Sequence, residues 1–389
     1  MKKITGRSAF LEILKDEGVT HLFGNPGTTE LPIMHALKDF PEIKYILGLQ
    51  ESIVVAMADG YSRATGKLSA CNVHVAPGLG NAMGAIYNAK FVGSPIIITA
   101  GQQEQGHGLM EPMLYGPLVR MAEPLVKWAT EVTRLEDLPR IMRRAAKIAL
   151  SPPTGPVFIS LPGDILNTEA KIDLGKSSRI IDTYKPNHDT IELIANKITK
   201  HKNPVIIAGH EVATSNAFTE ISSFAEITGS AVYQQTVPHG SHYPSEHIAF
   251  MGTLPRLQKP TKKILDNYDL LICIGCDGLR MSVWSEIEPL PPKMAIIHIG
   301  LDDWQIGKNY YTELGIIGNV KTTLNDLNLF LTNTLTPKYV KQANNNLKII
   351  SKNNWTAKRK NLSLKTLDDK FKKPITPNWL MMNLTNNLS

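Results

Sequence analysis

The chain has 389 residues, of which 42% are hydrophobic and 20% charged, and its formal net charge is +7. Its length predicts two or three domains, and no apolar run approaches the roughly 18 residues that a membrane-spanning helix needs. The N-terminus, MKKITGR, has no apolar core behind its lysines, so we expect no secretory signal peptide and a cytoplasmic location.

The first 165 residues alternate strand-like and helix-like segments. Strands are predicted at 21–23, 45–49, 70–75, 95–100 and 156–161, and helices at 8–16, 52–63 and 80–91. This alternation is typical of βαβ units with a parallel sheet.

A second block of the same kind follows residues 166–187, which are polar and irregular and are interpreted as a linker. Strands are predicted at 204–207, 231–235, 270–274, 295–299 and 315–317, and a helix over 214–228. The predicted fold class is therefore α/β, with two doubly wound parallel-sheet domains at 1–165 and 188–332.

Residues 333–374 are interpreted as a second linker. Between 338 and 373 this stretch is rich in Lys, Arg and Asn and contains no acidic residue before Asp368. A nucleic-acid surface would interleave aromatic groups among the basic ones, and only three aromatic residues occur here. A solvated linker helix is the better interpretation, and we predict no nucleic-acid partner and no membrane contact.

The chain has three cysteines, Cys71, Cys273 and Cys276, and this low, odd count argues against a disulfide scaffold. Two of them form a C-x-x-C pattern that overlaps the apolar run at 270–275. We predict buried structural thiols there, because no second pair of metal ligands accompanies them.

Three consecutive strand-to-helix junctions of the first block carry polar groups. Glu51 directly follows an apolar strand and opens a helix, although a carboxylate in apolar surroundings costs several kcal/mol unless it is protonated or paired. Junctions of a parallel sheet line up at one edge, where ligands bind. We therefore expect Thr28, Glu51, His74 and Asn81 to surround one site.

Several short segments carry a resemblance to a known family: FGNPG (23–27), LQE (49–51), ADGY (58–61), GNAMG (80–84), TAGQQ (99–103) and PLVKW (124–128). They resemble, in order and spacing, the thiamine diphosphate-dependent enzymes of the acetolactate synthase and pyruvate oxidase type, and in particular the benzoylformate decarboxylases. The resemblance implies a pyrimidine-binding domain at 1–165 and a Rossmann-like central domain at 188–332.

The third domain of that family holds the cofactor's diphosphate and Mg²⁺ through a Gly-Asp-Gly motif, which is not found in these 389 residues. The resemblance thus covers the N-terminal and central domains only. Residues 375–389 resemble the opening helix of the third domain, and we expect the isolated chain to be incomplete for catalysis.

The resemblance implies roles for single residues. Glu51 would share a proton with the cofactor's pyrimidine ring, His74 would relay protons at the substrate, and Thr28 would contact the substrate's carboxylate. Cofactor-binding residues would be Pro26, Gly27, Glu51, Pro77 and Asn81; no metal ligand is predicted. Simpler roles stay open: Glu51, Thr28 and Asn81 as helix caps, and His74 as a core histidine.

The implied function is thiamine diphosphate-dependent decarboxylation or carboligation of a 2-keto acid. Ser282 stands at or near the position of a second active-site histidine of the benzoylformate enzymes, which leaves an acetolactate synthase-like carboligation open. A non-catalytic relative that acts as a binding or regulatory partner is a further alternative. Thiamine diphosphate and Mg²⁺ are the expected cofactors, nothing in the chain specifies FAD, and a homodimer or homotetramer is expected.

Overall fold

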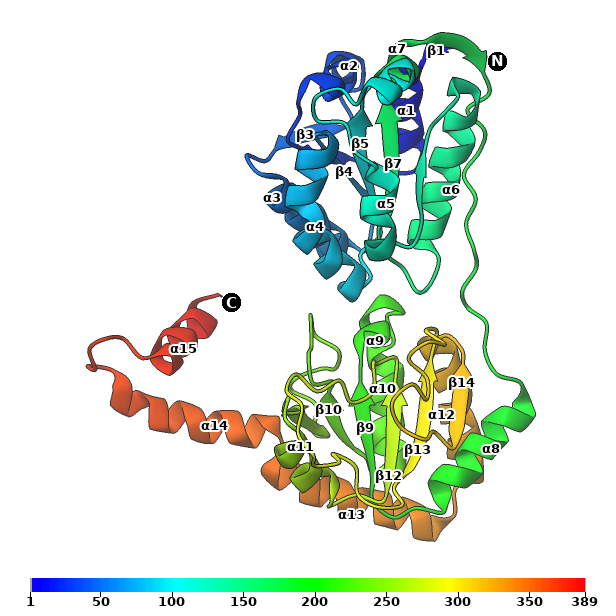
Figure 1. Ribbon diagram of the computed structural model, residues 1–389. Coiled ribbons are helices and arrows are strands. Elements are labelled where there is room, and N and C mark those ends of the chain that lie inside the picture. The colour runs from blue at the N-terminus through cyan, green and yellow to red at the C-terminus, as the bar shows by residue number, and fades with distance from the viewer. Residues whose placement is uncertain (1, 389) are drawn as a thin grey trace. The chain divides into compact units, whose positions relative to one another are not determined.

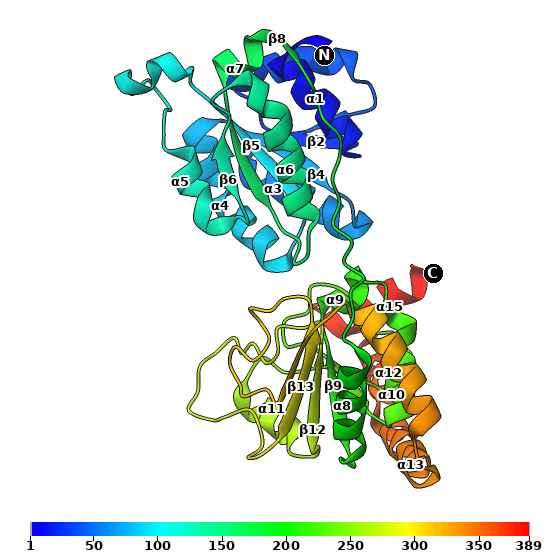
Figure 2. The same cartoon turned by 90° about the vertical axis from the view of Figure 1, so that its right-hand side faces the viewer.

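The computed structural model describes residues 2–388, and the chain divides into two compact units, Met1–Asp182 and Thr183–Ser389 (Figure 1). Each unit is built around a six-stranded parallel sheet with helices on both faces (Figures 1 and 2). The structure thus confirms the predicted α/β class with two doubly wound sheets.

The sheet of the first unit has the strand order β3-β2-β4-β5-β7-β6. Its strands are β2 (His21–Gly24), β3 (Lys44–Leu47), β4 (Ser69–Val73), β5 (Ile96–Gln102), β6 (Ala129–Glu131) and β7 (Val157–Pro162). The three central strands β4, β5 and β7 are buried along their whole length. Such continuous burial is typical of parallel strands covered on both faces.

Two hydrophobic cores flank this sheet. One lies under α1 (Gly6–Asp16), α2 (Leu31–Ala36), α6 (Leu138–Leu150) and α7 (Gly163–Asn167). The other lies under α3 (Glu51–Thr65), α4 (Val75–Val92) and α5 (Leu118–Ala122). The connecting loops lie at the carboxyl ends of the strands.

A short two-stranded sheet closes the first unit, and the sequence did not predict it. Strand β1 (Lys2–Thr5) pairs antiparallel with β8 (Glu169–Ile172), with Lys3 opposite Lys171. Residues 169–172, predicted to be irregular, therefore form an edge strand. The pairing joins segments more than 160 residues apart, and short polar strands carry little sequence signal.

The sheet of the second unit has the order β11-β10-β9-β12-β13-β14. Its strands are β9 (Pro204–Ala208), β10 (Ala231–Gln234), β11 (Phe250–Thr253), β12 (Leu270–Ile274), β13 (Ala295–Gly300) and β14 (Leu314–Ile317). Its helices are α8 (His188–Thr199), α9 (His210–Thr214), α10 (Phe218–Thr228), α11 (Gln258–Leu265) and α12 (Val320–Thr334). The single helix predicted over 214–228 is thus wrong at its start: α9 ends at Thr214, and Asn216 adopts a left-handed φ of 52° before α10 begins.

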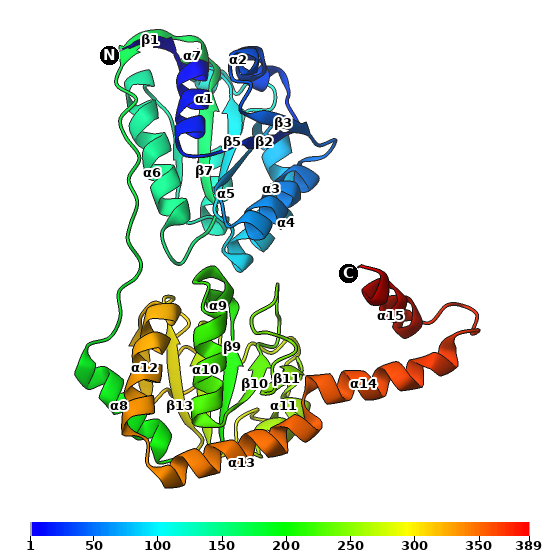
Figure 3. The same ribbon diagram turned by 180° about the vertical axis from the view of Figure 1, so that it is seen from behind.

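Three further helices complete the second unit: α13 (Pro337–Asn353), α14 (Trp355–Thr366) and α15 (Pro377–Asn387) (Figure 3). The expected linker segment is helical, but it is not wholly solvated. Tyr339, Ala343 and Ile350 of α13 are buried, and the Trp355 ring lies 6.4 Å from that of Phe250. Helix α15 contributes no buried residue.

The helix predicted to begin at Gly80 begins earlier, at Val75, with His74 at its N-cap position. The glycines at 78 and 80 misled the prediction, because glycine usually disfavours a helix interior. Gly78 is explained by packing: a Cβ there would lie 3.4 Å from Cγ of Glu51. The early start places His74 directly at the carboxyl end of β4.

Candidate active site

The candidate site of the first unit lies where the direction of strand order reverses. From β2 the chain first adds β3 on one side and then crosses to place β4 on the other. The loops after β2 and β4 therefore diverge, and such a switch point is where open α/β sheets bind ligands. The connections after β2, β3 and β4, including the first turns of α3 and α4, supply every candidate residue predicted from the sequence.

Glu51 is the first residue of α3, and its side chain bridges two loops. The residue is only 7% exposed. Its Oε1 accepts a hydrogen bond from Nδ2 of Asn25 at 2.9 Å, and its Oε2 accepts one from Nδ2 of Asn81 at 3.0 Å. The two amides offset the cost of burying the carboxylate, and the helix N-terminus favours its anionic form. The predicted proximity of Glu51 and Asn81 is thus a direct hydrogen bond.

The N-terminus of α3 is capped without help from Glu51. The side chain of Gln50 accepts hydrogen bonds from the backbone N–H groups of Ser52 and Ile53. Since the cap is supplied by its neighbour, the Glu51 carboxylate is directed to the amides of Asn25 and Asn81. Each carboxylate oxygen still has capacity to accept a second hydrogen bond.

His74 is held by Glu30, a buried residue that the sequence did not single out. Nδ1 of His74 lies 2.8 Å from Oε2 of Glu30, and the Glu30 residue is 1% exposed. A carboxylate can only accept hydrogen bonds. Nδ1 of His74 therefore carries the ring's proton and donates a hydrogen bond to Glu30. In the neutral ring, Nε2 of His74 is then left with a lone pair.

Glu30 is a hub of four hydrogen bonds. Besides His74, it accepts from the backbone N–H of Gly27 at 2.8 Å, the Thr29 hydroxyl at 2.8 Å and the backbone N–H of Gly101 at 2.8 Å. These donors come from the loop after β2 and from β5 as well as from the β4 junction. The hub therefore fixes the relative positions of three strand ends.

Two backbone features show how tightly this corner is packed. A Cβ on Gly27 would lie 2.3 Å from Cε1 of His74, so only glycine leaves room for the imidazole. The next residue after the histidine, Val75, is fully buried and has a φ of 46°. A β-branched residue rarely adopts positive φ, and such strain is concentrated at functional sites.

The remaining predicted residues lie nearer the surface. Pro26 is half-buried, and Thr28, Pro77 and Asn81 are exposed. Within residues 2–388, the Thr28 hydroxyl has no hydrogen-bond partner, whereas the adjacent Thr29 lies 3.1 Å from Nδ1 of His74. The structure thus groups Glu51 with Asn81 and His74 with Glu30, while Thr28 stays free to contact another molecule.

The second unit has a switch point of the same kind, between β9 and β12, and it also holds a buried glutamate. Glu211, in α9, accepts hydrogen bonds from the backbone N–H groups of Leu301 at 2.7 Å and Asp302 at 3.3 Å. Burial raises the pKa of Glu211 to about 7, against the effect of these two hydrogen bonds. Gly275 packs against it with a φ of 57°.

Three histidines gather near this second edge. The ring of His239 lies 5.3 Å from that of His210 and 5.3 Å from that of His242. Burial lowers the pKa of His242 to about 3, with the neighbouring His239 and His210 adding to the effect. Ser282, discussed above as a replaced histidine, is exposed, and its N–H donates to the carbonyl of Arg256 at 3.1 Å.

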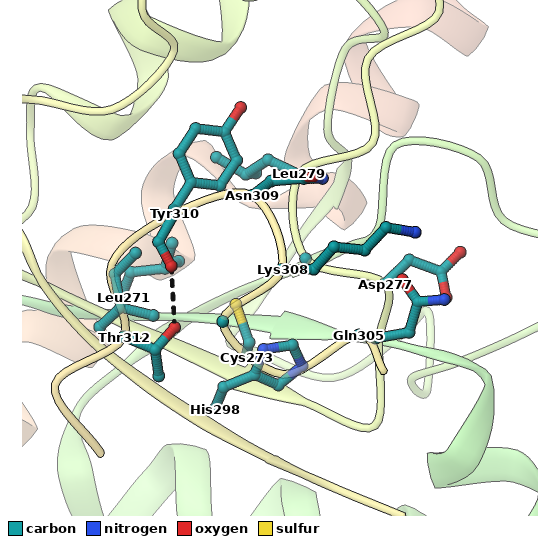
Figure 4. A pocket seen from close by; sticks show the side chains of 13 residues that line it. Leu271, Cys273, Asp277, Leu279, His298, Gln305, Lys308, Asn309, Tyr310 and Thr312 are labelled. Carbon is teal, nitrogen blue, oxygen red and sulfur yellow. Dashed lines mark hydrogen bonds between the residues drawn. The ribbon is translucent and has the colours of Figure 1, made fainter. Parts of the chain in front are cut away.

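A small cavity of about 20 Å³ lies among Cys273, His298 and Tyr310 in the second unit (Figure 4). A cavity of this volume holds about one water molecule, which is too little for a cofactor. All three cysteines are free and buried, as predicted for structural thiols. A hydrogen bond with Cys273 and burial hold the pKa of Cys276 well above its usual value.

In the described part of the chain, no group of three His, Cys, Asp or Glu side chains is arranged to hold a metal ion. None of the helices between residues 2 and 388 is both long and apolar enough to cross a membrane.

Two family models match the chain. The N-terminal TPP-binding domain of thiamine pyrophosphate enzymes matches residues 4–113, and the central domain of thiamine pyrophosphate enzymes matches residues 191–327. The first match includes strands β2 to β5 of the first sheet, and the second match includes all six strands of the second sheet.

Curated relatives give the same result. A benzoylformate decarboxylase of Pseudomonas aeruginosa is 32% identical over 327 residues, covering 83% of this chain and 61% of the relative. An acetolactate synthase large subunit of Haemophilus influenzae is 29% identical over 334 residues, covering 84% and 58%. The chain thus spans about three fifths of the length of these relatives.

Solved structures are similar too. A thiamine diphosphate-dependent 4-hydroxybenzoylformate decarboxylase of Rhodococcus jostii RHA1 superposes with a TM-score of 0.79 at 32% identity, covering 84% of this chain and 62% of that one. A benzoylformate decarboxylase of Polynucleobacter necessarius gives 0.77 at 33% identity, covering 84% and 61%.

Proposed function

The chain belongs to the thiamine pyrophosphate enzymes, of which it has the N-terminal and central domains, and we propose that it forms the pyrimidine-binding half of a thiamine diphosphate-dependent decarboxylase acting on a 2-keto acid. The observation that carries this proposal is the buried Glu51 carboxylate, held by two amides at the switch point of the first sheet beside the His74–Glu30 pair.

The residues at this edge suit the aminopyrimidine of thiamine diphosphate. Glu51 keeps acceptor capacity on both oxygens, Asn81 is exposed beside it, and glycines at 27 and 78 keep the backbone close. Pro26, Gly27, Pro77 and Asn81 would line the ring, and Glu51 would share a proton with its nitrogen. When bound, the cofactor would supply a nucleophilic carbon for chemistry at the carbonyl of a 2-keto acid. No described residue is assigned to Mg²⁺.

His74 has a separate task in this proposal. Its Nδ1 proton is committed to Glu30, and its side chain keeps 21% of its surface exposed. Nε2 of His74 can therefore accept a proton or, in the charged ring, return it to the reacting carbon of the substrate. Glu30 acts as a positioning residue that fixes the ring's tautomer, and the exposed Thr28 hydroxyl would donate to the substrate's carboxylate.

A test measures CO₂ release from a panel of 2-keto acids, including benzoylformate and pyruvate, with thiamine diphosphate and Mg²⁺. Because the chain spans three fifths of its relatives, the assay uses the chain both alone and together with the remaining part of a benzoylformate decarboxylase. We expect turnover in the second arm and its loss in Glu51→Gln. The matched control is Glu192→Gln, which changes an exposed glutamate of α8. Unchanged turnover in Glu51→Gln would refute the proposal.

Carboligation of the acetolactate synthase type is a second candidate. It is favoured by the relatives that bear this name and by Ser282, whose hydroxyl cannot take up a proton at neutral pH. Product analysis separates the two: an aldehyde as main product supports decarboxylation, and a branched 2-hydroxy-3-keto acid supports carboligation.

A non-catalytic role as a binding partner is the remaining alternative. It predicts no turnover in either arm of the assay, together with a stable complex between this chain and another protein. We expect instead a homodimer or homotetramer of the active protein, which sedimentation velocity can measure.

A further inference from the structure

A cleft with a volume of about 520 Å³ lies in the first unit, between α6 and the segment that follows β8. Figures 1 and 3 show that this segment runs alongside α6. The volume is within the range of small-molecule sites, which is roughly 300–1,000 Å³. Besides Arg143, the charged residues that line the cleft are Arg140 and Arg144 from α6, Lys171 from β8, Lys176 from the segment after β8, and the acids Glu136 and Asp173.

The wall of this cleft is fixed by a buried arginine. Arg143 donates to the carbonyls of Leu174 at 3.2 Å and Gly175 at 3.3 Å, which ties the segment after β8 to α6. The charge of Arg143 is itself matched by Asp16 at 2.9 Å and Glu17 at 2.6 Å. Arg143, whose charge is paired, therefore holds the two walls of the cleft together. It is distinct from the other four cations of the lining.

The four cations at the opening are not paired in this way. Arg140, Arg144, Lys171 and Lys176 form no ion pair with a carboxylate anywhere in residues 2–388. Arg140 and Arg144 stand four residues apart on one helix, a spacing at which like charges destabilise the helix. The guanidinium of Arg144 is steadied from one side by the ring of Trp128, at 5.7 Å.

The two acids of the lining offset only part of the charge of the four cations. The Asp173 carboxylate accepts a hydrogen bond from the backbone N–H of Gly175 at 3.0 Å, and Glu136 lies 3.7 Å from Arg134, outside the cleft. The cross-strand neighbour of Lys171 is another lysine, Lys3, which is paired with Glu169 at 3.0 Å. The opening thus keeps an excess of positive charge.

We propose that this cleft binds a small molecule that carries a phosphate group, with Arg140 and Arg144 as its principal contacts and Lys171 and Lys176 closing from the opposite wall. A guanidinium presents paired N–H donors that match the oxygens of a phosphate, and an anion placed between two arginines removes their mutual repulsion. The site is independent of the proposed cofactor contacts of Glu51.

The test is isothermal titration of the chain with inorganic pyrophosphate at constant ionic strength. We expect saturable binding with a Kd of about 1 mM or tighter, weakened at least tenfold in the double variant Arg140→Gln/Arg144→Gln. The double variant Lys171→Gln/Lys176→Gln, on the other wall, should weaken binding in the same direction. Thermal melting of each variant without ligand checks that it is folded.

The matched control is Lys38→Gln/Lys67→Gln, which removes the same charge from exposed positions of the same unit outside the cleft. It should bind pyrophosphate as the wild type does. Absence of saturable binding in the wild type, equal weakening in the control, or unchanged affinity in both cleft variants would each overturn the proposal. Tighter binding of citrate than of pyrophosphate would overturn the choice of phosphate.

Discussion

The two six-stranded parallel sheets of this chain differ in strand order, and each has a buried glutamate at its switch point, but the two carboxylates are held differently. Glu51 of the first unit is bound by the side-chain amides of Asn25 and Asn81. Glu211 of the second unit is bound by the backbone N–H groups of Leu301 and Asp302.

The donors decide what each carboxylate can do. The backbone donors of Leu301 and Asp302 lie directly after β13. Glu211 therefore links α9 to the end of this strand, and its side chain cannot rotate away without breaking both hydrogen bonds. Side-chain amides can rotate, so Glu51 can exchange a partner for a ligand while the backbone stays in place. Parallel sheets of the same size therefore hold a buried glutamate through side-chain donors in one unit and through backbone donors in the other.

The sharpest test of this comparison replaces each glutamate by glutamine in the complemented assay. We expect Glu51→Gln to lower kcat/KM by about 10²–10⁴-fold, the usual contribution of a group that transfers a proton. Glu211→Gln should lower it by less than about threefold. Similar losses in the two variants would show that the edges do not differ as described.

The second test uses pH, because burial raises the pKa of Glu211 to about 7 from its ordinary 4.5. The folded unit then holds this proton more tightly than the unfolded chain, so the contribution to stability is present below pH 4.5 and is lost as the pH rises to about 7. Relative to Glu211→Gln, the wild type should lose roughly 3 kcal/mol of unfolding free energy between pH 4.5 and 7.5.

Comparison with the variant is needed because the lowered pKa of His242 has the opposite effect. The lowered pKa of His242 destabilises the folded unit as the pH falls below about 6.5. The effects of Glu211 and His242 on the pH dependence of the unfolding free energy therefore partly cancel in the wild type. Denaturant titrations at each pH give the difference directly. A difference between wild type and variant that does not change with pH would contradict the shifted pKa of Glu211.

A third test exchanges one glycine in each unit, Gly275 beside Glu211 and Gly27 beside His74. In Gly275→Ala, the new Cβ would lie 2.5 Å from Cβ of Glu211 at a φ of 57°, and we expect a loss of stability of about 2 kcal/mol or more. In Gly27→Ala, the new Cβ would displace the His74 ring, so activity should fall at least tenfold while stability falls by about 1 kcal/mol. Thermal melting and the decarboxylase assay measure the two effects.

The smallest expected change concerns the tautomer of His74. In Glu30→Gln, the amide can present a donor to Nδ1 of His74, which would move the ring proton to Nε2 and lower activity by about tenfold. Nitrogen NMR of the labelled histidine reports which ring nitrogen is protonated. A proton that remains on Nδ1 would mean that Glu30 does not position the ring.

The sequence predicted five of the six strands in each sheet, because apolar strands alternate there with helical segments; the short strands β6 and β11 were missed. It also predicted that Glu51 and Asn81 would lie near each other. Asn25 and Glu30 were missed for a physical reason: the partners of Glu30 lie 44 and 71 residues away, on other strands. A GTTE segment reads locally as an ordinary helix start, so only the tertiary structure reveals its partners.

The contact between Thr29 and His74 shows the same limit. Adjacent residues in a tight turn point in different directions, and the sequence did not indicate that either threonine contacts the histidine. The structure assigns that contact to Thr29 and leaves Thr28 exposed.

The Glu30 hub also bears on how the molecule folds. Its hydrogen bonds to His74 and to the Gly101 amide span 44 and 71 residues, so they can form only after three separate strands have found their register. Contacts of such long sequence separation form late in folding, since their loops must close first. Exchange of the Gly101 amide proton with solvent should therefore be slow only in the completed sheet. A protein with this arrangement completes the Glu30 hub last, so we expect partly folded forms of the chain to lack it.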